Sequence, residues 1–354
     1  MRRYARFAVT ITLASLPVWS GAGAAGLPNI VVLATGGTIA GVGNSGTRGG
    51  YEAGRLGVDQ LIEAVPQARQ LANLRGEQFA SIGSQDMTDA LWLRLARRAN
   101  ELLPSPDVDG LVITHGTDTI EETAYFLNLV IKSAKPVVMT AAMRPATSLS
   151  ADGPLNFYDA VAVAAHPDAR GRGVLVVVND GIHGAATLTK TSTTAVQTFF
   201  SPLRGLIGEV NLGRVEFFQD PHRRHTLQSE FSVEGVSALP RVDIIYAHAD
   251  MPADLIDAAV AAGARGLVIA GLGNGNMNQV ALAALARASK LGVVCVRSSR
   301  VATGQVLRNV EVDDDALGFV AADELNPPKA RVLLKLALLK PRPLHEVQRL
   351  FETY

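Results

Sequence analysis

The feature that most constrains the fold of this chain is an alternation between short apolar runs and longer segments with helical periodicity. The apolar runs, rich in β-branched residues, lie at residues 30–34, 79–82, 111–114, 137–140 and 174–178. Segments with a helical pattern lie between them, at residues 88–103, 119–131 and 156–165. We expect Thr88 to cap the first of these helices. Apolar strands that alternate with helices predict an α/β fold with a parallel sheet covered on both faces.

A second and smaller alternation follows a polar stretch. Its predicted strands are residues 242–246, 267–270 and 293–296. One helix is expected to carry Pro252 in its first turn, another to begin at Gln279, and two terminal helices to surround Leu333 and Val347. The sequence therefore predicts a larger N-terminal domain, a linker and a smaller C-terminal α/β domain, at residues 26–216, 217–239 and 240–354.

The first 25 residues have the composition of a secretory signal peptide. Three arginines precede an apolar run at residues 7–19, and small residues follow it. The run is too short for a membrane span, so we expect a signal peptide at residues 1–25 and a periplasmic or secreted protein. Its removal would leave 30 Lys and Arg against 33 Asp and Glu. This balance favours neither nucleic acid nor a membrane as a partner.

Polar side chains gather after the predicted strands of the first domain. In an open α/β sheet, ligands bind beyond the carboxyl ends of the strands. Hydroxyls, carboxylates and one lysine follow these ends, among them Thr35, Thr38, Ser84, Gln85, Thr117, Asp118 and Lys190. A glycine-rich patch at residues 41–57 predicts a mobile loop over the end of the first strand.

Such a rim suits acyl transfer without a metal or other cofactor. A threonine hydroxyl is a poor nucleophile and needs a neighbouring group to take its proton. Thr38 or Thr35 can supply the oxygen, while Thr117, Asp118 and Lys190 can form the activating group. Backbone N–H groups in the glycine turns can hold an oxyanion, and losing one such donor typically costs about 2.7–4 kcal/mol.

Other motifs have less specific interpretations. Residues 41–46 spell G-x-G-x-x-G but lead into more glycine instead of a helix, which argues against dinucleotide binding. His222 and His225 enclose two arginines that would repel a cation, so we expect a solvated linker there. We expect His115 to be a packed histidine at a strand end, and residues 313–315, three aspartates, to form a charged surface turn.

A different class of protein also fits these coarse features. An exported two-domain α/β chain can be a solute-binding protein of a transporter, which needs binding groups but no nucleophile. Release of ammonia from an amide substrate separates this alternative from an enzyme of acyl transfer.

Two motifs of the chain, at residues 35–41 and 113–119, closely resemble the paired signatures of the bacterial L-asparaginase family. The likeness is strongest to its type II (periplasmic) asparaginases and glutaminase-asparaginases. Shorter blocks in the family order lie at residues 82–87, 142–145, 188–191, 273–276 and 298–301. The resemblance extends from Leu27 to the C-terminus.

The resemblance implies an amidohydrolase that converts L-asparagine, with L-glutamine as an alternative substrate, into the acid and ammonia. It implies that Thr38 attacks the side-chain amide with help from Tyr51, forming a covalent acyl-enzyme. Thr117, Asp118 and Lys190 would form a second hydroxyl cluster. The implied substrate-binding residues of the first domain are Gly37, Ser84, Gln85, Thr117, Asp118 and Ala142.

The resemblance also implies a homotetramer, built as a dimer of dimers, whose active sites are shared between protomers. Asn276 and Glu311 of the second domain would complete the site of a neighbouring protomer. It further implies a Rossmann-like sheet with a left-handed crossover near the active site.

Two residues depart from the family pattern. Cys295, the single cysteine, cannot form the intrachain disulfide of some type II members, and its apolar surroundings predict a buried thiol. Asn278 stands where some relatives carry tyrosine. The preference between asparagine and glutamine therefore does not follow from the resemblance, since one methylene is typically worth only about 1–3 kcal/mol.

Overall fold

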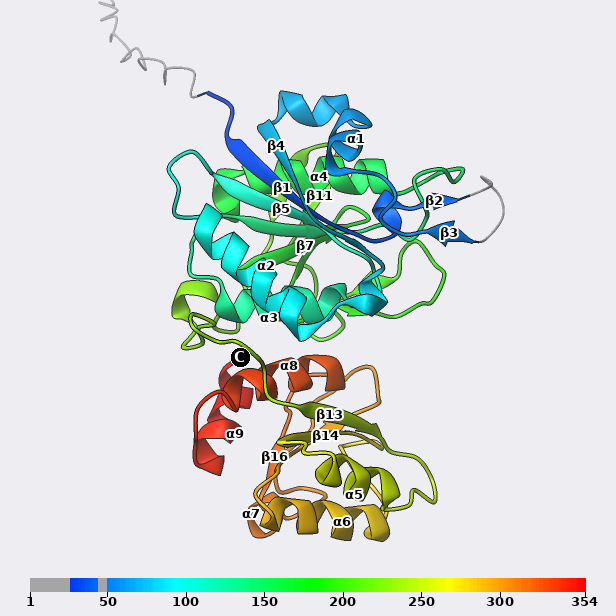
Figure 1. Ribbon diagram of the computed structural model, residues 1–354, viewed down its shortest axis with the longest axis vertical. Coiled ribbons are helices and arrows are strands. Elements are labelled where there is room, and N and C mark those ends of the chain that lie inside the picture. The colour runs from blue at the N-terminus through cyan, green and yellow to red at the C-terminus, as the bar shows by residue number, and fades with distance from the viewer. Residues whose placement is uncertain (1–25, 44–49) are drawn as a thin grey trace, which may run out of the picture.

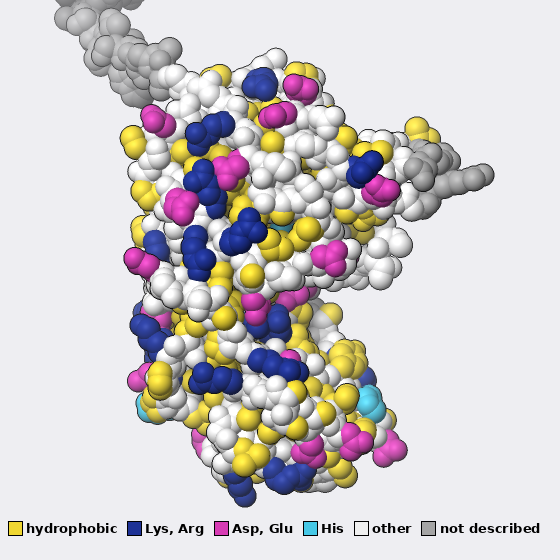
Figure 2. All heavy atoms as spheres, viewed as in Figure 1, with side chains coloured by type: hydrophobic (Ala, Val, Ile, Leu, Met, Phe, Trp, Pro, Cys, Tyr) yellow, Lys and Arg dark blue, Asp and Glu magenta, His cyan; other side chains and the backbone are white. Residues whose placement is uncertain are grey.

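Two sheets of mainly parallel strands, each covered by helices, are stacked along the long axis of the molecule (Figure 1). The computed structural model describes residues 26–43 and 50–354. The expected signal peptide, and residues 44–49 of the expected mobile loop, lie outside the described residues. Figure 2 shows the first domain overhanging the second on one side. No helix in the described part of the chain is long and apolar enough to span a bilayer.

The larger sheet has eight strands in the order β12-β11-β8-β7-β6-β5-β1-β4. The five predicted strands are all present and mutually parallel: β1 (Asn29–Gly36), β4 (Asn73–Ile82), β5 (Gly110–Thr114), β6 (Val137–Thr140) and β7 (Val174–Val178). β4 begins at Asn73, before the predicted start, because its first half is polar. That half lies at the edge of the sheet, where polar side chains reach solvent.

Alternate residues of the central strands enter two separate cores. In β1, Ile30 and Val32 pack on one face of the sheet while Val31 and Leu33 pack on the other. Helices α1 (Val58–Glu63) and α4 (Gly153–Ala165) cover the first face. Helices α2 (Asp89–Leu102) and α3 (Ile120–Val130) cover the second face. Thr88 caps α2 as predicted, because its hydroxyl accepts a hydrogen bond from the Leu91 N–H at 3.2 Å.

One crossover of this sheet has the opposite hand to the others. The β5-α3-β6 and β6-α4-β7 connections move in the same direction across the sheet, yet α3 and α4 cover opposite faces. The connections through α1 and α2 share the hand of the one through α3. Since right-handed crossovers predominate strongly, the connection through α4 is the left-handed one. The implied left-handed crossover is therefore confirmed.

Three antiparallel strands extend the sheet, and the apolar pattern did not predict them. They are β8 (Gly181–Gly184), β11 (Gly208–Asn211) and β12 (Arg214–Phe217). Asn179 and Asp180 form the two-residue turn between β7 and β8, with φ of 54° and 64°. This Asn-Asp pair is the local signal for a tight hairpin that the sequence offered. Short two-stranded ribbons join β2 (Val42–Gly43) to β3 (Tyr51–Glu52), and β9 (Thr189–Lys190) to β10 (Phe199–Phe200).

The second sheet has four parallel strands in sequence order. They are β13 (Val242–Tyr246), β14 (Gly266–Gly271), β15 (Val294–Ser299) and β16 (Phe319–Ala321), of which β16 was not predicted. Helices α5 (Asp254–Ala261) and α6 (Gln279–Lys290) cover one face, and α8 (Pro327–Ala337) and α9 (Leu344–Thr353) the other. The start of α6 at Gln279 and the burial of Cys295 are confirmed.

Three expectations about single features were wrong. Pro252 lies outside α5, whose N-cap is Ala253. Asp314 is not at the surface: it is fully buried at the start of α7 (Asp314–Leu317), because the buried Arg297 neutralises its charge. His225 is buried instead of solvated, since the segment after β12 folds back over α3. There Lys132 donates a hydrogen bond to the Ser229 carbonyl at 2.6 Å.

Helices α3 and α8 join the two domains into a continuous apolar core. Two lysines of α8 cross this junction with their charges buried. Lys329 pairs with Glu121 at 3.1 Å, and Lys335 pairs with Asp89 at 2.6 Å. The Tyr125 hydroxyl also donates to the carbonyl of the terminal residue, Tyr354, at 3.1 Å. The two sheets are therefore held in a fixed relation by buried polar contacts as well as by packing.

Candidate active site

The carboxyl ends of β1, β4 and β5 meet at one point of the sheet edge. Gly37 follows β1 with φ of 80°, and a Cβ atom on it would lie 2.5 Å from the Gly116 Cα. A Cβ atom on Gly116 would in turn lie 2.6 Å from the Ser84 hydroxyl oxygen. Only glycine fits at both positions, because any side chain would collide with these neighbours. The three turns that follow these strands are thus in direct contact.

Thr38 lies in the turn after β1, within a short 3-10 helix at Thr38–Ala40. Its side chain is buried, and its hydroxyl oxygen is 2.6 Å from the hydroxyl of Tyr51. Tyr51 is on β3, which pairs with β2 beyond the same turn, and nearly half of its surface is exposed. The Gly54 N–H donates to the Gly37 carbonyl at 3.1 Å, which fixes this ribbon against the turn. The structure brings the predicted Thr38 and Tyr51 into hydrogen-bond contact.

A second hydroxyl follows β5. The Lys190 ammonium donates to the Thr117 hydroxyl at 3.0 Å and to an Asp118 carboxylate oxygen at 2.7 Å. The Asp118 N–H donates to the Ser84 hydroxyl at 3.2 Å. The Thr119 hydroxyl donates to the Ser84 carbonyl at 2.7 Å. The predicted Thr117, Asp118 and Lys190 therefore form one hydrogen-bonded cluster, although 73 residues separate Thr117 from Lys190.

The second domain supports the strand that carries Lys190, which sequence reasoning missed. Lys329 of α8 is buried and donates hydrogen bonds to the Leu188 carbonyl and to Glu121. Asn326, the N-cap of α8, lies 3.4 Å from the Thr189 hydroxyl. No local pattern marks these two residues, because their partners lie more than 130 residues away along the chain.

The remaining predicted residues occupy less connected positions. Ala142 is buried after β6, while Gln85 is exposed beside Asp86. Asn276 and Glu311 belong to the second domain, and within the described residues no hydrogen bond joins them to the threonines. Asn276 instead pairs with Leu272 across a tight turn. The structure of one chain therefore assembles the first-domain residues but not these two.

His115 is buried as expected, and it cannot act as a base toward solvent. Its Nδ1 lies 2.8 Å from the Gly116 carbonyl, and its Nε2 has no partner. Burial lowers the pKa of His115 to about 4, so the ring is neutral at physiological pH. It packs behind the turn after β5 and adds no charge to the site.

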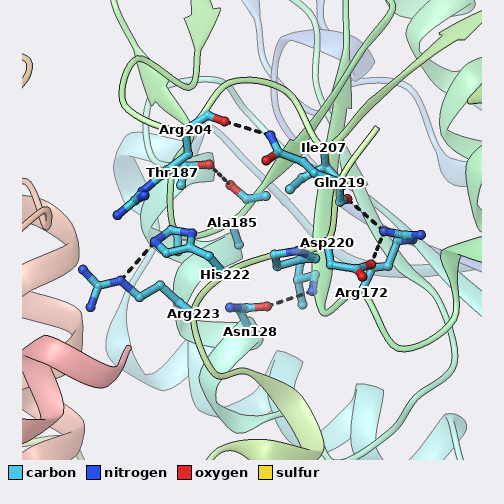
Figure 3. A pocket seen from close by; sticks show the side chains of 14 residues that line it. Asn128, Arg172, Ala185, Thr187, Arg204, Ile207, Gln219, Asp220, His222 and Arg223 are labelled. Atoms are coloured by element: carbon cyan, nitrogen blue, oxygen red, sulfur yellow. Dashed lines mark hydrogen bonds and ion pairs between the residues drawn. The ribbon is translucent and has the colours of Figure 1, made fainter. Parts of the chain in front are cut away.

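The cavity drawn in Figure 3 lies away from these residues. It has a volume of about 100 Å³ and lies between the start of β7, the end of β8 and the segment after β12. Arg172, Asp220, His222 and Arg223 line it, but none of the predicted catalytic residues does. Its arginines are already paired with carboxylates, for example Arg172 with Asp220. This cavity is therefore separate from the two hydroxyl clusters at the sheet edge.

Both domains match known families over most of their length. The family "Asparaginase, N-terminal" matches residues 29–223, and the "Glutaminase/Asparaginase C-terminal domain" matches residues 241–351. The fold, the two hydroxyl clusters and these matches define a two-domain α/β amidohydrolase. The chain belongs to the asparaginase family.

Relatives of known name are similar over almost the whole chain. It is 54% identical to a "Probable L-asparaginase periplasmic" of Haemophilus influenzae, over 94% of this chain and 95% of that protein. It is 49% identical to the "L-asparaginase 2" of Escherichia coli, with 97% and 98% covered. A "Glutaminase-asparaginase" of Pseudomonas fluorescens is 47% identical, with 93% and 91% covered.

A solved structure has the same fold. The crystal structure of a "Probable Cytoplasmic L-asparaginase" from Campylobacter jejuni matches with a TM-score of 0.90 and 45% identity. The match covers 92% of this chain and 100% of that chain. The fold prediction, including its two α/β domains, is confirmed.

Proposed function

We propose that the protein hydrolyses the side-chain amide of L-asparagine to L-aspartate and ammonia through an acyl-enzyme on Thr38. The observation that carries the proposal is the pair of hydroxyl clusters at the contacting ends of β1 and β5. Thr38 bonds Tyr51 at 2.6 Å, and Thr117 bonds Lys190 at 3.0 Å. The names of the relatives support asparagine as the substrate.

The reaction proceeds in two halves. Thr38 Oγ1 attacks the amide carbon while its proton leaves through the hydrogen bond to Tyr51. The tetrahedral intermediate collapses, the carbon–nitrogen bond breaks, and ammonia departs with the proton. Water then attacks the Thr38 ester beside the cluster of Thr117, Asp118 and Lys190, which yields the acid and free Thr38. Backbone N–H groups near Gly37 stabilise the oxyanion.

The rest of the substrate is held by polar groups around Ser84. Its carboxylate binds at Ser84 and the backbone beside it, and its ammonium binds Asp118 and Gln85. Asp118 suits this role, because its second carboxylate oxygen is not engaged by Lys190 and its side chain is partly exposed. Gly37 and Ala142 line the space for the amide, where small residues leave room for it.

We further propose a homotetramer in which Asn276 and Glu311 complete the site of a neighbouring protomer. Glu311 is exposed and faces no partner cation within the described part of its own chain. The segment around it carries large exposed apolar residues, since Leu307 is 47% and Val310 63% exposed. Apolar side chains beside an unpaired carboxylate are typical of a surface that another chain covers.

We also propose that residues 1–25 are a signal peptide and that the mature protein works in the periplasm. The arginine-rich start and the short apolar run support export, as does the name of the Haemophilus relative. The Campylobacter structure is named cytoplasmic, so fractionation of cells producing the full chain is the test. We further propose that residues 26–216 form the catalytic domain and residues 240–354 the second domain, with a linker at 217–239.

Steady-state ammonia release from both amides tests the activity. We expect turnover of L-asparagine by the purified tetramer, and L-glutamine is the comparison substrate. Trapping a covalent adduct on Thr38, followed by peptide mapping, tests the acyl-enzyme itself. Binding of L-asparagine without ammonia release would refute the proposal and restore the solute-binding alternative.

A further inference from the structure

Arg297 of β15 is the largest fully buried side chain of the molecule's described part, and the catalytic scheme gives it no role. Its guanidinium forms two 2.6 Å hydrogen bonds with the two carboxylate oxygens of Asp314, which is also fully buried. This bidentate geometry is the strongest arrangement that an arginine and a carboxylate can adopt. The charges are therefore paired without any solvent contact.

The remaining donors of Arg297 reach two separate loops. One terminal nitrogen donates to the carbonyls of Asn274 and Gly275, at 3.0 and 3.4 Å. The other donates to the Leu307 carbonyl at 3.2 Å. Asp314 extends the network, because its second oxygen accepts a hydrogen bond from the Asn309 N–H at 2.8 Å. A single ion pair thus holds both loops by their backbones.

These two loops carry Asn276 and Glu311. The Asn276 turn is narrow, since Leu272 and Asn276 exchange two backbone hydrogen bonds of 2.7 Å. The loops are also joined directly, because the Asn274 side chain accepts a hydrogen bond from the Leu307 N–H at 2.8 Å. Asn276 thus follows Gly275, whose carbonyl accepts a hydrogen bond from Arg297. Glu311 lies along the chain between Asn309 and Asp314, which are joined by a hydrogen bond.

A buried ion pair is a poor way to gain stability alone. Replacing such a pair with well-packed apolar residues is often neutral or stabilising, whereas removing one partner is strongly destabilising. Its distinctive property is directional: Arg297 offers five donors in a rigid plane, and each is used here. Apolar packing cannot specify in this way the positions of the three carbonyls that Arg297 holds and of the one N–H group that Asp314 holds.

We propose that Arg297 and Asp314 are positioning residues that fix Asn276 and Glu311 as one rigid unit for the neighbouring protomer's active site. This inference rests on the proposed sharing of sites. The ion pair touches no substrate. It holds two loops at a set spacing, so that the Asn276 amide and the Glu311 carboxylate meet a bound amino acid together. Loosening it should weaken substrate capture more than the chemical step.

The first test is the kinetics of intact Arg297→Lys and Asn274→Ala tetramers. Lysine keeps the buried charge but loses the planar contacts, and Asn274→Ala removes only the link between the loops. We expect the KM for L-asparagine to rise at least tenfold in Arg297→Lys and about threefold in Asn274→Ala, with kcat changed less. Val296→Ala is the matched control, because it destabilises the same strand but faces α8. It should leave KM unchanged.

Hybrid tetramers separate this inference from the proposed function. A Thr38→Ala protomer lacks the nucleophile but has intact Asn276 and Glu311 loops. An Arg297→Lys protomer has the nucleophile but has loosened loops. Co-expression should restore about a quarter of the wild-type sites, because one site of each mixed dimer receives both intact parts. Thr38→Ala with Glu311→Ala serves as the reference pair.

If the reference pair complements and the Arg297→Lys pair does not, the positioning role is overturned while site sharing stands. If neither pair complements, shared sites and this inference fall together. If Arg297→Lys does not assemble, the Asn274→Ala measurements decide. An unchanged KM in Asn274→Ala would then overturn the inference.

Discussion

The carboxyl group of Asp159 gives the sharpest prediction about stability. Asp159 lies on α4 and is fully buried, and neither of its oxygens has a hydrogen-bond partner of normal geometry. Burial raises the pKa of Asp159 to about 7 with a further increase from Asp180, against a smaller opposing effect of the Gly213 backbone. The folded protein therefore keeps this proton well above the pH at which an unfolded chain releases it.

The sign of the pH dependence follows from proton binding. Between about pH 4 and pH 7 the unfolded chain loses the Asp159 proton while the folded chain retains it, so folding stability falls as pH rises. A shift of this size is equivalent to about 4 kcal/mol, and relaxation of the surroundings around the charged carboxylate reduces the expected loss to about 2–4 kcal/mol. Above pH 7 the loss is complete and constant.

Asp159→Asn removes the titration. The amide needs hydrogen bonds of its own, which adds an offset that does not vary with pH. The quantity to follow is the melting temperature of Asp159→Asn minus that of the wild-type protein. We expect this difference to increase by roughly 4–12 °C between pH 4 and pH 8, because only the wild-type protein loses stability over this range. Calorimetry at one subunit concentration measures it, and the exposed Asp107→Asn is the control. A difference that does not change with pH would refute the inference that Asp159 keeps its proton in the folded protein.

Four further single substitutions, and one double variant, test the site and its support. Thr38→Ala should reduce ammonia release by about 10⁴-fold or more with an unchanged circular dichroism spectrum, and a folded variant with a near-normal rate would eliminate Thr38 as the nucleophile. Glu311→Ala should raise the KM for L-asparagine, and a fully active monomer in light scattering would contradict shared sites. Lys329→Met should cost about 3–5 kcal/mol in urea unfolding, because the largely buried Glu121 loses its only cation among the described residues and keeps only the Asn326 amide as a partner, and adding Glu121→Gln should recover part of it. Gly37→Ala should abolish activity or folding, since its Cβ would lie 2.5 Å from Gly116; a soluble, active variant would show that the turns can separate.

Much of the first domain was predictable because its signals are local. The central strands are continuous apolar runs with alternate residues buried on opposite faces, and Thr88 stands where a cap is needed. The rule for open α/β sheets then places Thr38, Thr117 and Ser84 at one edge. The specific roles of Tyr51, Asn276 and Glu311 came from the family resemblance, since no spacing in the chain points to them.

The sequence by itself determined which segments are strands, which are helices, and which hydroxyls follow strand ends. Only the tertiary structure decided that Asp314, the middle one of three consecutive aspartates, is buried as the partner of Arg297. It also decided that β8 pairs antiparallel with β7, and that the left-handed crossover is the one through α4. Periodicity reports burial along one segment, whereas these features depend on groups brought together from distant segments. Lys190 reaches Thr117 across 73 residues for the same reason, because only the folded sheet sets that distance.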